Sequence, residues 1–281
     1  MSFKEFFRRF SHHKLALISL CVLITEILLI VLLPIVMDLD PYGVDSSAFY
    51  GAPSQTHILG ADGTGRDIFA RLIYGGRTSL LIGFAATAVC ISVGLPLGLL
   101  AGFYRGWFEA IIMRLSDIFQ SFPIVILALV ITAVFGSSVS VLILIIGFLQ
   151  WPSVAKLIYG NVLSVREREF VEAERTIGAS NLKLLLCTVL PNSVAPLWVA
   201  LAFRISSSML TESMLSFIGA GVRPPTASWG NIIQEASSVA VLTNRWWIWV
   251  PAGICLMITV FCLNFVGEGV RDALDPKMKR V

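Results

Sequence analysis

The residues that could perform chemistry are few and scattered along this chain. Its three histidines are His12, His13 and His57, and none of them lies in an apolar segment. The five cysteines form no C-x-x-C pair and no Cys/His cluster, so the sequence predicts neither a zinc site nor a disulfide framework. No placement suits a catalytic triad or a pair of catalytic carboxylates. The chain is therefore expected not to be an enzyme and to bind no metal and no cofactor itself.

A glycine-rich segment, residues 60–67, resembles a phosphate-binding loop only superficially. It has the glycine spacing of such a loop but lacks the Lys-Ser/Thr ending that contacts phosphate and Mg²⁺. No other segment is a candidate. Nucleotide binding by this chain is therefore not expected.

Ionisable side chains inside apolar segments are candidates for a polar path across a membrane, because a charge there is costly and usually functional. Arg204 lies centrally in its segment, where it either lines a cavity or pairs with a neighbouring helix. Glu212 lies on the same segment. Met209 and Met214 offer either an adaptable lining or ordinary core packing. These four residues form the predicted path or gate.

Two other acids in apolar segments have simpler interpretations. Glu26 is expected to hydrogen-bond within a helix bundle. Asp117 lies one helical turn from Arg114, which predicts a local ion pair.

A polar, charge-rich segment interrupts the apolar runs in the second half of the chain. Residues 166–177 have helical spacing, and Gly178 is a good helix-ending residue because left-handed backbone costs glycine little. Ser180 or Asn181 can then cap a second short helix from Leu182 onward. A rigid helix–turn–helix of this kind suits docking into a soluble partner. An ordinary amphipathic helix at the membrane surface is the alternative.

The elements that position these residues must be membrane helices. The chain has 281 residues, of which 56% are hydrophobic and only 14% charged, with a mean hydropathy of +0.82. Soluble domains are about 25% charged. A bilayer core about 30 Å thick needs about 20 apolar residues of helix, and six stretches qualify. They lie near residues 15–37, 79–103, 111–135, 139–158, 191–215 and 247–266.

The distribution of lysine and arginine predicts that both termini are cytoplasmic. In that orientation most of the Lys and Arg residues lie inside, as the positive-inside rule requires. The outer segments then hold only Arg66, Arg71, Arg77, Arg223 and Arg245. The charge-rich segment is placed in the cytoplasm.

The predicted organisation is a single membrane domain. It comprises a cytoplasmic segment (1–14), a first transmembrane helix (15–37), an extracytoplasmic loop (38–78), a five-helix core (79–266) and a cytoplasmic tail (267–281). The core includes a cytoplasmic loop (159–190) and an extracytoplasmic loop (217–246). Residues 66–74 are expected to form an amphipathic helix on the membrane surface, and Gly94, Gly98 and Gly102 are expected to form a helix-packing face.

The charge-rich segment resembles the loop signature of membrane subunits of bacterial ABC importers. That signature is Glu-Ala-Ala, a glycine, and Ile-x-Leu-Pro; here it reads Glu172-Ala173-Glu174, Gly178, Thr188 and Leu190-Pro191, with the spacing intact. Glu174 replaces an alanine and Thr188 replaces an isoleucine. Neither change breaks the helix–glycine–helix geometry, but Glu174 puts a charge where a small residue usually packs against the ATPase.

Further segments narrow the resemblance to the C-type permease of the dipeptide/oligopeptide/nickel family. Residues 57–67, 75–80, 224–230 and 267–276 are similar to that subfamily, so the similarity covers essentially the whole chain in order.

The resemblance implies a fold and a set of partners. The fold is all-α, a polytopic membrane protein with six transmembrane helices and a cytoplasmic coupling helix, as in type I ABC importer permeases. The implied partners are a homologous permease subunit, two ATPase subunits that bind ATP and Mg²⁺, an extracytoplasmic substrate-binding protein and membrane lipid, with no nucleic acid. The implied location is the bacterial inner membrane. The implied ATPase-coupling residues are Glu172, Ala173, Glu174, Thr176, Ile177, Gly178, Ala179 and Lys183.

The implied function is ATP-driven import of short peptides through this subunit. Import of nickel or a metal chelate by the same architecture is the alternative. An ion-coupled secondary transporter would need a driving-ion site near mid-membrane, for which only Arg204 and Glu26 offer anything. A signalling or scaffold membrane protein would explain the docking helix but not the family-like outer loops.

Overall fold

The computed structural model describes residues 3–274, which form helices joined by loops and contain no β-strand. One isolated β-bridge joins Ala61 and Asp67. The helices in chain order are α1 (Phe3–His12), α2 (Lys14–Val36), α3 (Ile68–Tyr104), α4 (Gly106–Ser121), α5 (Ile124–Phe135), α6 (Val139–Arg166), α7 (Glu169–Thr176), α8 (Asn181–Lys183), the π-helix η1 (Leu184–Val189), α9 (Leu190–Ser193), α10 (Ala195–Phe217), α11 (Trp229–Gln234), the 3₁₀-helix η2 (Glu235–Ser237), α12 (Val239–Asn244) and α13 (Trp246–Leu274).

Four of these helices are long and apolar enough to cross a membrane by themselves: α2, α3, α6 and α13. Two further helix pairs are long and apolar enough only when taken together, and both are bent. The axes of α4 and α5 meet at 87°, and residues Asn181–Ser193 meet α10 at 58°. The predicted all-α membrane fold is confirmed, and the six predicted transmembrane helices correspond to these four helices and two bent pairs, but the expectation of an uninterrupted helix over 111–135 is wrong. Pro123 explains that break, because proline forces the preceding residue, Phe122, into extended backbone (φ −102°, ψ 141°).

Helix α3 is much longer than expected. Residues 66–74 were predicted to form a separate surface helix, and this is wrong, since 68–74 are the first two turns of the 37-residue α3. Asp67 caps this helix by accepting a hydrogen bond from the Ala70 amide at 2.7 Å. Its first turns are buried, with Ile68 1% and Arg71 3% exposed, because α11 and α13 pack around them. These residues are therefore buried among helices and do not lie on the membrane surface, where the sequence pattern had placed them.

The stripe Gly94, Gly98 and Gly102 on α3 packs against α6, as predicted. A Cβ atom added at Gly98 would lie 2.4 Å from the Ala155 carbonyl oxygen, and one at Gly102 would lie 2.7 Å from Val162 Cβ. Only glycine allows the two backbones to approach this closely.

Helix α2 packs against α13 and is anchored to α3 through a defect in its own backbone. Pro34 lacks an amide hydrogen and so leaves the Ile30 carbonyl without its helical donor. Arg77 of α3 fills this role, with Nε 3.0 Å from the Ile30 oxygen and one terminal nitrogen 2.9 Å from the Val31 oxygen. Between α2 and α13, the Thr259 hydroxyl lies 2.8 Å from Glu26 Oε1, which confirms that Glu26 hydrogen-bonds within the bundle.

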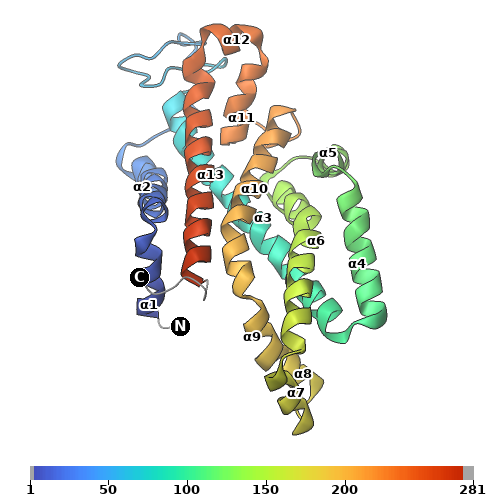
Figure 1. The fold of residues 1–281 in the computed structure, drawn as a ribbon. Coiled ribbons are helices and arrows are strands. Elements are labelled where there is room, and N and C mark those ends of the chain that lie inside the picture. The colour runs from blue at the N-terminus through green and yellow to red at the C-terminus, as the bar shows by residue number, and fades with distance from the viewer. Residues whose placement is uncertain (1–2, 275–281) are drawn as a thin grey trace.

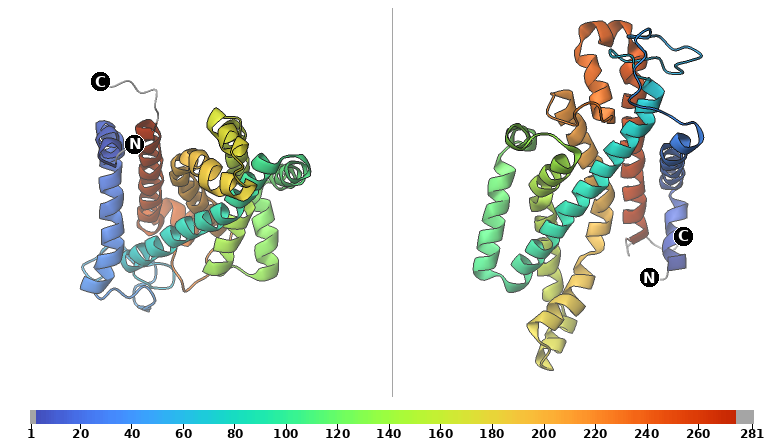
Figure 2. Two further views of the ribbon diagram at one scale, coloured as in Figure 1. Left: turned by 90° about the horizontal axis from the view of Figure 1, so that it is seen from below. Right: turned by 180° about the vertical axis from the view of Figure 1, so that it is seen from behind.

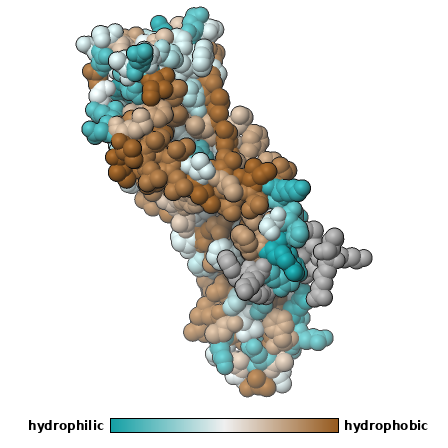
Figure 3. Space-filling view, turned by 90° about the vertical axis from the view of Figure 1, so that its left-hand side faces the viewer, coloured by the Kyte–Doolittle hydropathy of each residue, from teal (hydrophilic) through white to brown (hydrophobic). Residues whose placement is uncertain are grey.

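The spans separate two polar ends, which we call the upper and lower ends as they appear in Figure 1. The upper end holds the loop between α2 and α3 together with α11 and α12. At the lower end α1 begins, α13 ends, and α7 and α8 project beyond the other helices, as the view from behind in Figure 2 also shows. In the space-filling view of Figure 3, hydrophobic side chains form a broad belt across the middle of the molecule. This arrangement matches a bilayer.

The loop between α2 and α3 (residues 37–67), which we call the upper loop, is held by buried and half-buried contacts between charged groups. Asp62, 1% exposed, accepts hydrogen bonds from Arg66 Nε at 2.8 Å and from the Thr64 hydroxyl at 2.7 Å. Burial alone would raise the pKa of Asp62, but the hydrogen bonds from Thr64 and Arg66 outweigh it and hold the pKa below its usual value. His57 lies 2.8 Å from Asp67 through Nδ1, and that hydrogen bond raises the pKa of His57. These contacts give the loop a fixed shape.

Two predictions fall partly outside the described residues. Of the predicted tail, residues 267–274 continue α13, and 275–281, including the end of the family-like 267–276 segment, lie outside them. Residues 1 and 2 of the N-terminal segment also lie outside, and residues 3–12 form α1.

Candidate functional site

The charge-rich segment forms a bent projection at the lower end, which we call the elbow (residues 169–183, α7 to α8). Helix α7 ends at Thr176, and Gly178, two residues later, has the left-handed backbone (φ +86°) predicted for a helix-ending glycine. The Gly178 amide donates to the Arg175 carbonyl and the Ala179 amide to the Glu174 carbonyl, both at 3.1 Å, which is the Schellman arrangement. Ser180 then caps α8 through the Lys183 amide.

The second arm of the elbow differs from the expected short α-helix. Helix α8 is a single turn, and from Leu184 to Val189 the backbone is a π-helix that leads into α9. The wider turn places Leu184, Leu185 and Val189 in a buried cluster with Val171 of α7. The elbow is therefore fixed to the spans by its apolar side.

The outer side of the elbow is exposed in the described part of the chain. Its exposed residues include the predicted coupling residues Glu172, Ala173, Thr176, Ile177, Gly178 and Lys183. Ile177 is 84% exposed, an unusual fraction for isoleucine at the polar end of a molecule, and Leu182 is 62% exposed. Ala179 is half-buried. Exposed apolar residues flanked by charged ones are typical of a surface that docks to another protein.

Glu174 does not share this exposure. It is half-buried, and its Oε2 accepts a hydrogen bond from the Thr188 hydroxyl at 2.6 Å. The two positions at which the chain departs from the importer signature therefore contact each other. Together they link α7 to the π-helix η1.

Arg204 of α10 lines a polar pocket near the middle of the molecule. One of its terminal nitrogens donates to the Ser153 hydroxyl of α6 at 2.7 Å. Arg204 therefore borders this pocket and also contacts a neighbouring helix. Among the described residues Arg204 forms no ion pair.

The polar pocket has a volume of about 250 Å³ and lies at the bend between α4 and α5, between α6 and α10. Its polar side chains come from three helices. Its lining residues are Phe119, Gln120, Phe122, Ile124, Leu149, Gln150, Pro152, Ser153, Arg204, Ser207 and Thr211.

The expected ion pair between Arg114 and Asp117 is absent, and Asp117 pairs with another helix. Its Oδ1 lies 2.8 Å from Lys156 Nζ of α6, which also donates to Gln120 at 2.6 Å. Packing of α4 on α6 brings Lys156 to Asp117, a tertiary contact that spacing along one helix cannot predict.

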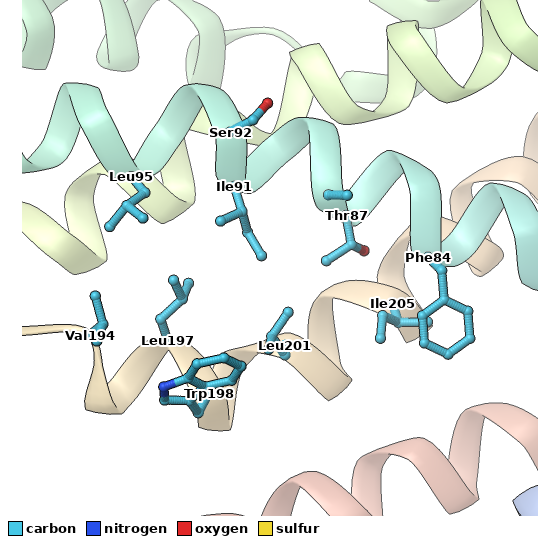
Figure 4. A pocket seen from close by; sticks show the side chains of 11 residues that line it. Phe84, Thr87, Ile91, Ser92, Leu95, Val194, Leu197, Trp198, Leu201 and Ile205 are labelled. Atoms are coloured by element: carbon cyan, nitrogen blue, oxygen red, sulfur yellow. The ribbon is translucent and has the colours of Figure 1, made fainter. Parts of the chain in front are cut away.

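A second pocket between α3 and α10, of about 490 Å³, is apolar (Figure 4). Ile91 and Leu95 of α3 face Leu197 and Leu201 of α10 across it, and no charged side chain lines it. A polar solute therefore finds only the hydroxyls of Thr87 and Ser92 and the indole N–H of Trp198 among the side chains that line it. The polar pocket is the better candidate for such a solute.

Glu212 and Met209, two of the predicted path or gate residues, are fully buried. Glu212 Oε1 accepts hydrogen bonds from the hydroxyls of Ser216 at 2.7 Å and Ser228 at 2.9 Å, and Ser79 of α3 lies 3.4 Å from Oε2. This network joins α3 and α10 to the loop before α11. Met209 packs against Gly83 of α3.

Met214, the fourth predicted path or gate residue, is 56% exposed. It therefore contributes little to the core of this chain. The roles of all four residues in a path stay predictions.

Sequence reasoning missed the companions of Arg204. Gln150 and Ser153 are three residues apart on α6, and Ser207 and Thr211 follow Arg204 by three and seven residues on α10. These spacings put each set on one helix face. Polar residues at helical spacing in an apolar segment were the sequence signal that could have identified these companions of Arg204.

Comparison with solved structures shows the fold that this chain shares. The chain superposes on permease-containing structures titled "Inward facing conformations of the MetNI methionine ABC transporter", with a TM-score of 0.61 for one crystal form, 19% sequence identity, and coverage of 73% of this chain and 97% of that one. A second crystal form gives a TM-score of 0.57 with 98% of its chain covered. The fold is that of an ABC transporter membrane chain.

Sequence comparison defines the family. Residues 94–280 match the family described as "Binding-protein-dependent transport system inner membrane component", and residues 2–53 match "N-terminal TM domain of oligopeptide transport permease C". The chain belongs to the binding-protein-dependent transport system inner membrane components. It is a multi-pass inner membrane subunit rather than an enzyme, and its family works with a binding protein and an ATPase. The resemblance inferred from the sequence is confirmed.

Among its relatives are bacterial permeases that match over nearly their full lengths. A putative peptide permease of Brucella ovis is 40% identical, with 96% of this chain and 89% of that protein covered. The glutathione transport system permease GsiD of Pectobacterium atrosepticum is 36% identical, with 98% and 91% covered. A GsiD of Escherichia coli is 37% identical, with 98% and 90% covered.

Proposed function

We propose that this chain is a permease subunit of an ATP-driven importer of short peptides. The relatives that match it over nearly their full lengths are named as peptide and glutathione permeases, and glutathione is itself a small peptide-like molecule. These names give no support to the nickel alternative. The polar pocket supports the proposal, because a zwitterionic substrate needs charged and hydrogen-bonding groups inside the membrane.

The elbow is the proposed contact with the ATPase. It projects at the lower end, its tip is exposed and apolar, and its other side is packed on the spans, so it can receive a push and pass it to α10 through η1 and α9. The exposure of Ile177 is the observation that carries this assignment. Glu172, Ala173, Thr176, Gly178, Ala179 and Lys183 complete the surface, and Glu174 shapes it from within.

The proposed assembly pairs this chain with a homologous permease, two ATPase subunits and an extracytoplasmic binding protein. ATP and Mg²⁺ would be bound by the ATPase subunits, and this chain would hold no cofactor. The lower end would face the cytoplasm, because the Lys and Arg residues concentrate there. The upper loop and residues 217–246 would then meet the binding protein, with α10 bordering the path.

Substitution of Ile177 tests the docking assignment. We expect Ile177→Asp to lose co-purification with the ATPase subunits, because a charge replaces the exposed apolar tip without disturbing any internal contact. Val44→Asp is the matched control: Val44 is also an exposed aliphatic residue (63%), but it lies at the upper end. ATPase retention by Ile177→Asp equal to that of the control would refute the assignment.

A further inference from the structure

We propose that the polar pocket binds the carboxylate group of the transported peptide, with Arg204 as its cationic ligand. This inference rests on the proposed function and specifies which part of the substrate this subunit recognises. Four features of the pocket carry it: the unpaired charge of Arg204, the unpaired amide of Gln150, the break in the helix beside them and the size of the cavity.

Arg204 carries a charge that its surroundings do not neutralise. A guanidinium stays protonated in proteins and offers five N–H donors, of which Ser153 accepts one. Arg204 is the tenth residue of the 23-residue α10, near the middle of that helix, where an arginine in a membrane span costs about 3 kcal/mol. A carboxylate is the natural partner because it matches the planar fork of the guanidinium.

Ser153 holds the arginine in place without competing for the ligand. Its hydroxyl donates to the backbone carbonyl of Gln150 at 2.7 Å and accepts a hydrogen bond from Arg204. Lys156, one turn further along α6, is already paired with Asp117 and Gln120. Arg204 is therefore the cation available to an anion in this pocket.

Gln150 supplies the independent observation. Its side chain is only 6% exposed, lines the pocket, and has neither Oε1 nor Nε2 in a hydrogen bond. A buried amide without partners costs about 1–3 kcal/mol per unsatisfied group. A ligand carboxylate in the pocket would accept from the amide nitrogen, and the amide oxygen could accept from a peptide N–H.

The helix break and the pocket volume fit a bound substrate end. The backbone leaves helical geometry at Phe122 and Pro123, beside the pocket, and irregular backbone at membrane depth is tolerated where it lines a cavity. About 250 Å³ is less than the roughly 300–1,000 Å³ of pockets that enclose a drug-sized ligand. A volume of this size suits one terminal residue of a peptide.

The test compares two peptides in the complete transporter, reconstituted with its partner subunits and binding protein. ATP-dependent uptake of trialanine and of trialanine amide is measured for the wild type and for Arg204→Gln. The binding protein can prefer one peptide, but it does so equally for both permeases. The effect of Arg204→Gln on trialanine uptake, divided by its effect on uptake of the amide, therefore reports on the permease alone.

We expect Arg204→Gln to lower kcat/KM for trialanine by tenfold or more and to change that for the amide by less than twofold. Arg204→Lys should fall in between, since lysine keeps the charge but not the planar fork. Arg114→Gln, an arginine on α4 outside the pocket, is the matched control and should affect both peptides equally. Equal losses for both peptides with Arg204→Gln would show a structural role and overturn the proposal.

Gln150→Leu gives a second readout that does not depend on the fold tolerating the loss of Arg204. Because the amide has no internal partner, the variant should be at least as thermally stable as the wild type while its trialanine uptake falls about threefold or more. Normal uptake by a stable Gln150→Leu would argue against the pocket. Failure of the wild-type complex to import any peptide with ATP would instead refute the proposed function.

Discussion

Glu174 and Thr188 are the residues at which this chain departs from the importer signature, and they form a hydrogen bond 2.6 Å long. Thr188 is 8% exposed, so removing one partner leaves a polar group with reduced access to water. A hydrogen bond to a charged group contributes about 1.5–3 kcal/mol, and an orphaned buried group costs a similar amount. The pair therefore behaves as one unit that fixes the angle between α7 and η1.

We expect Glu174→Ala and Thr188→Val each to lower the number of peptides transported per ATP hydrolysed. The double variant should recover most of this ratio, because neither polar group is left without its partner. The measurement is a double-mutant cycle on the coupling ratio and on the thermal stability of the complex. Additive losses would mean that the two residues act separately.

At the scale of elements, the α3–α6 contact depends on glycine at one face of α3. A Cβ atom at Gly98 would lie 2.4 Å from the Ala155 carbonyl oxygen, a backbone atom that cannot rotate away. We expect Gly98→Ala to lower the thermal stability of the purified subunit, with a cost of about 1–3 kcal/mol from overpacking. Gly160→Ala on α6 is the control, since a Cβ there has no heavy atom within 4 Å. A midpoint for Gly98→Ala equal to that of the control would contradict the close contact.

The elements show where sequence patterns suffice and where they fail. Apolar runs located the four long membrane helices and the two bent pairs, and Gly178 marked the bend of the elbow, because both signals are local. The 87° bend at Phe122 was missed although Pro123 was visible, since a proline can also be tolerated inside a membrane helix when neighbouring groups satisfy its backbone. Gln150 was missed because its importance lies in having no partner, which only the packed structure reveals.

For the whole molecule, the proposed orientation puts the two polar ends on opposite sides of the membrane with the lower end in the cytoplasm, as the distribution of Lys and Arg predicts. Ile177 and Val44 mark the two ends and are both highly exposed. Single cysteines placed at these positions, in a background whose five cysteines are replaced by serine, report the sidedness. Both sites are far enough from packed contacts for the substitution to be tolerated.

We expect a membrane-impermeant maleimide to label Val44→Cys in intact spheroplasts and Ile177→Cys only in inside-out vesicles. Addition of the ATPase subunits to stripped inside-out vesicles should protect Ile177→Cys, because the elbow tip would then be covered, and should leave the labelling of a cysteine on α1, at Phe7, unchanged. Phe7 is 52% exposed and lies at the same end, which makes it a control for general shielding by bound protein. Labelling of Ile177→Cys from the outside would reverse the orientation and, with it, the assignment of the elbow to the ATPase.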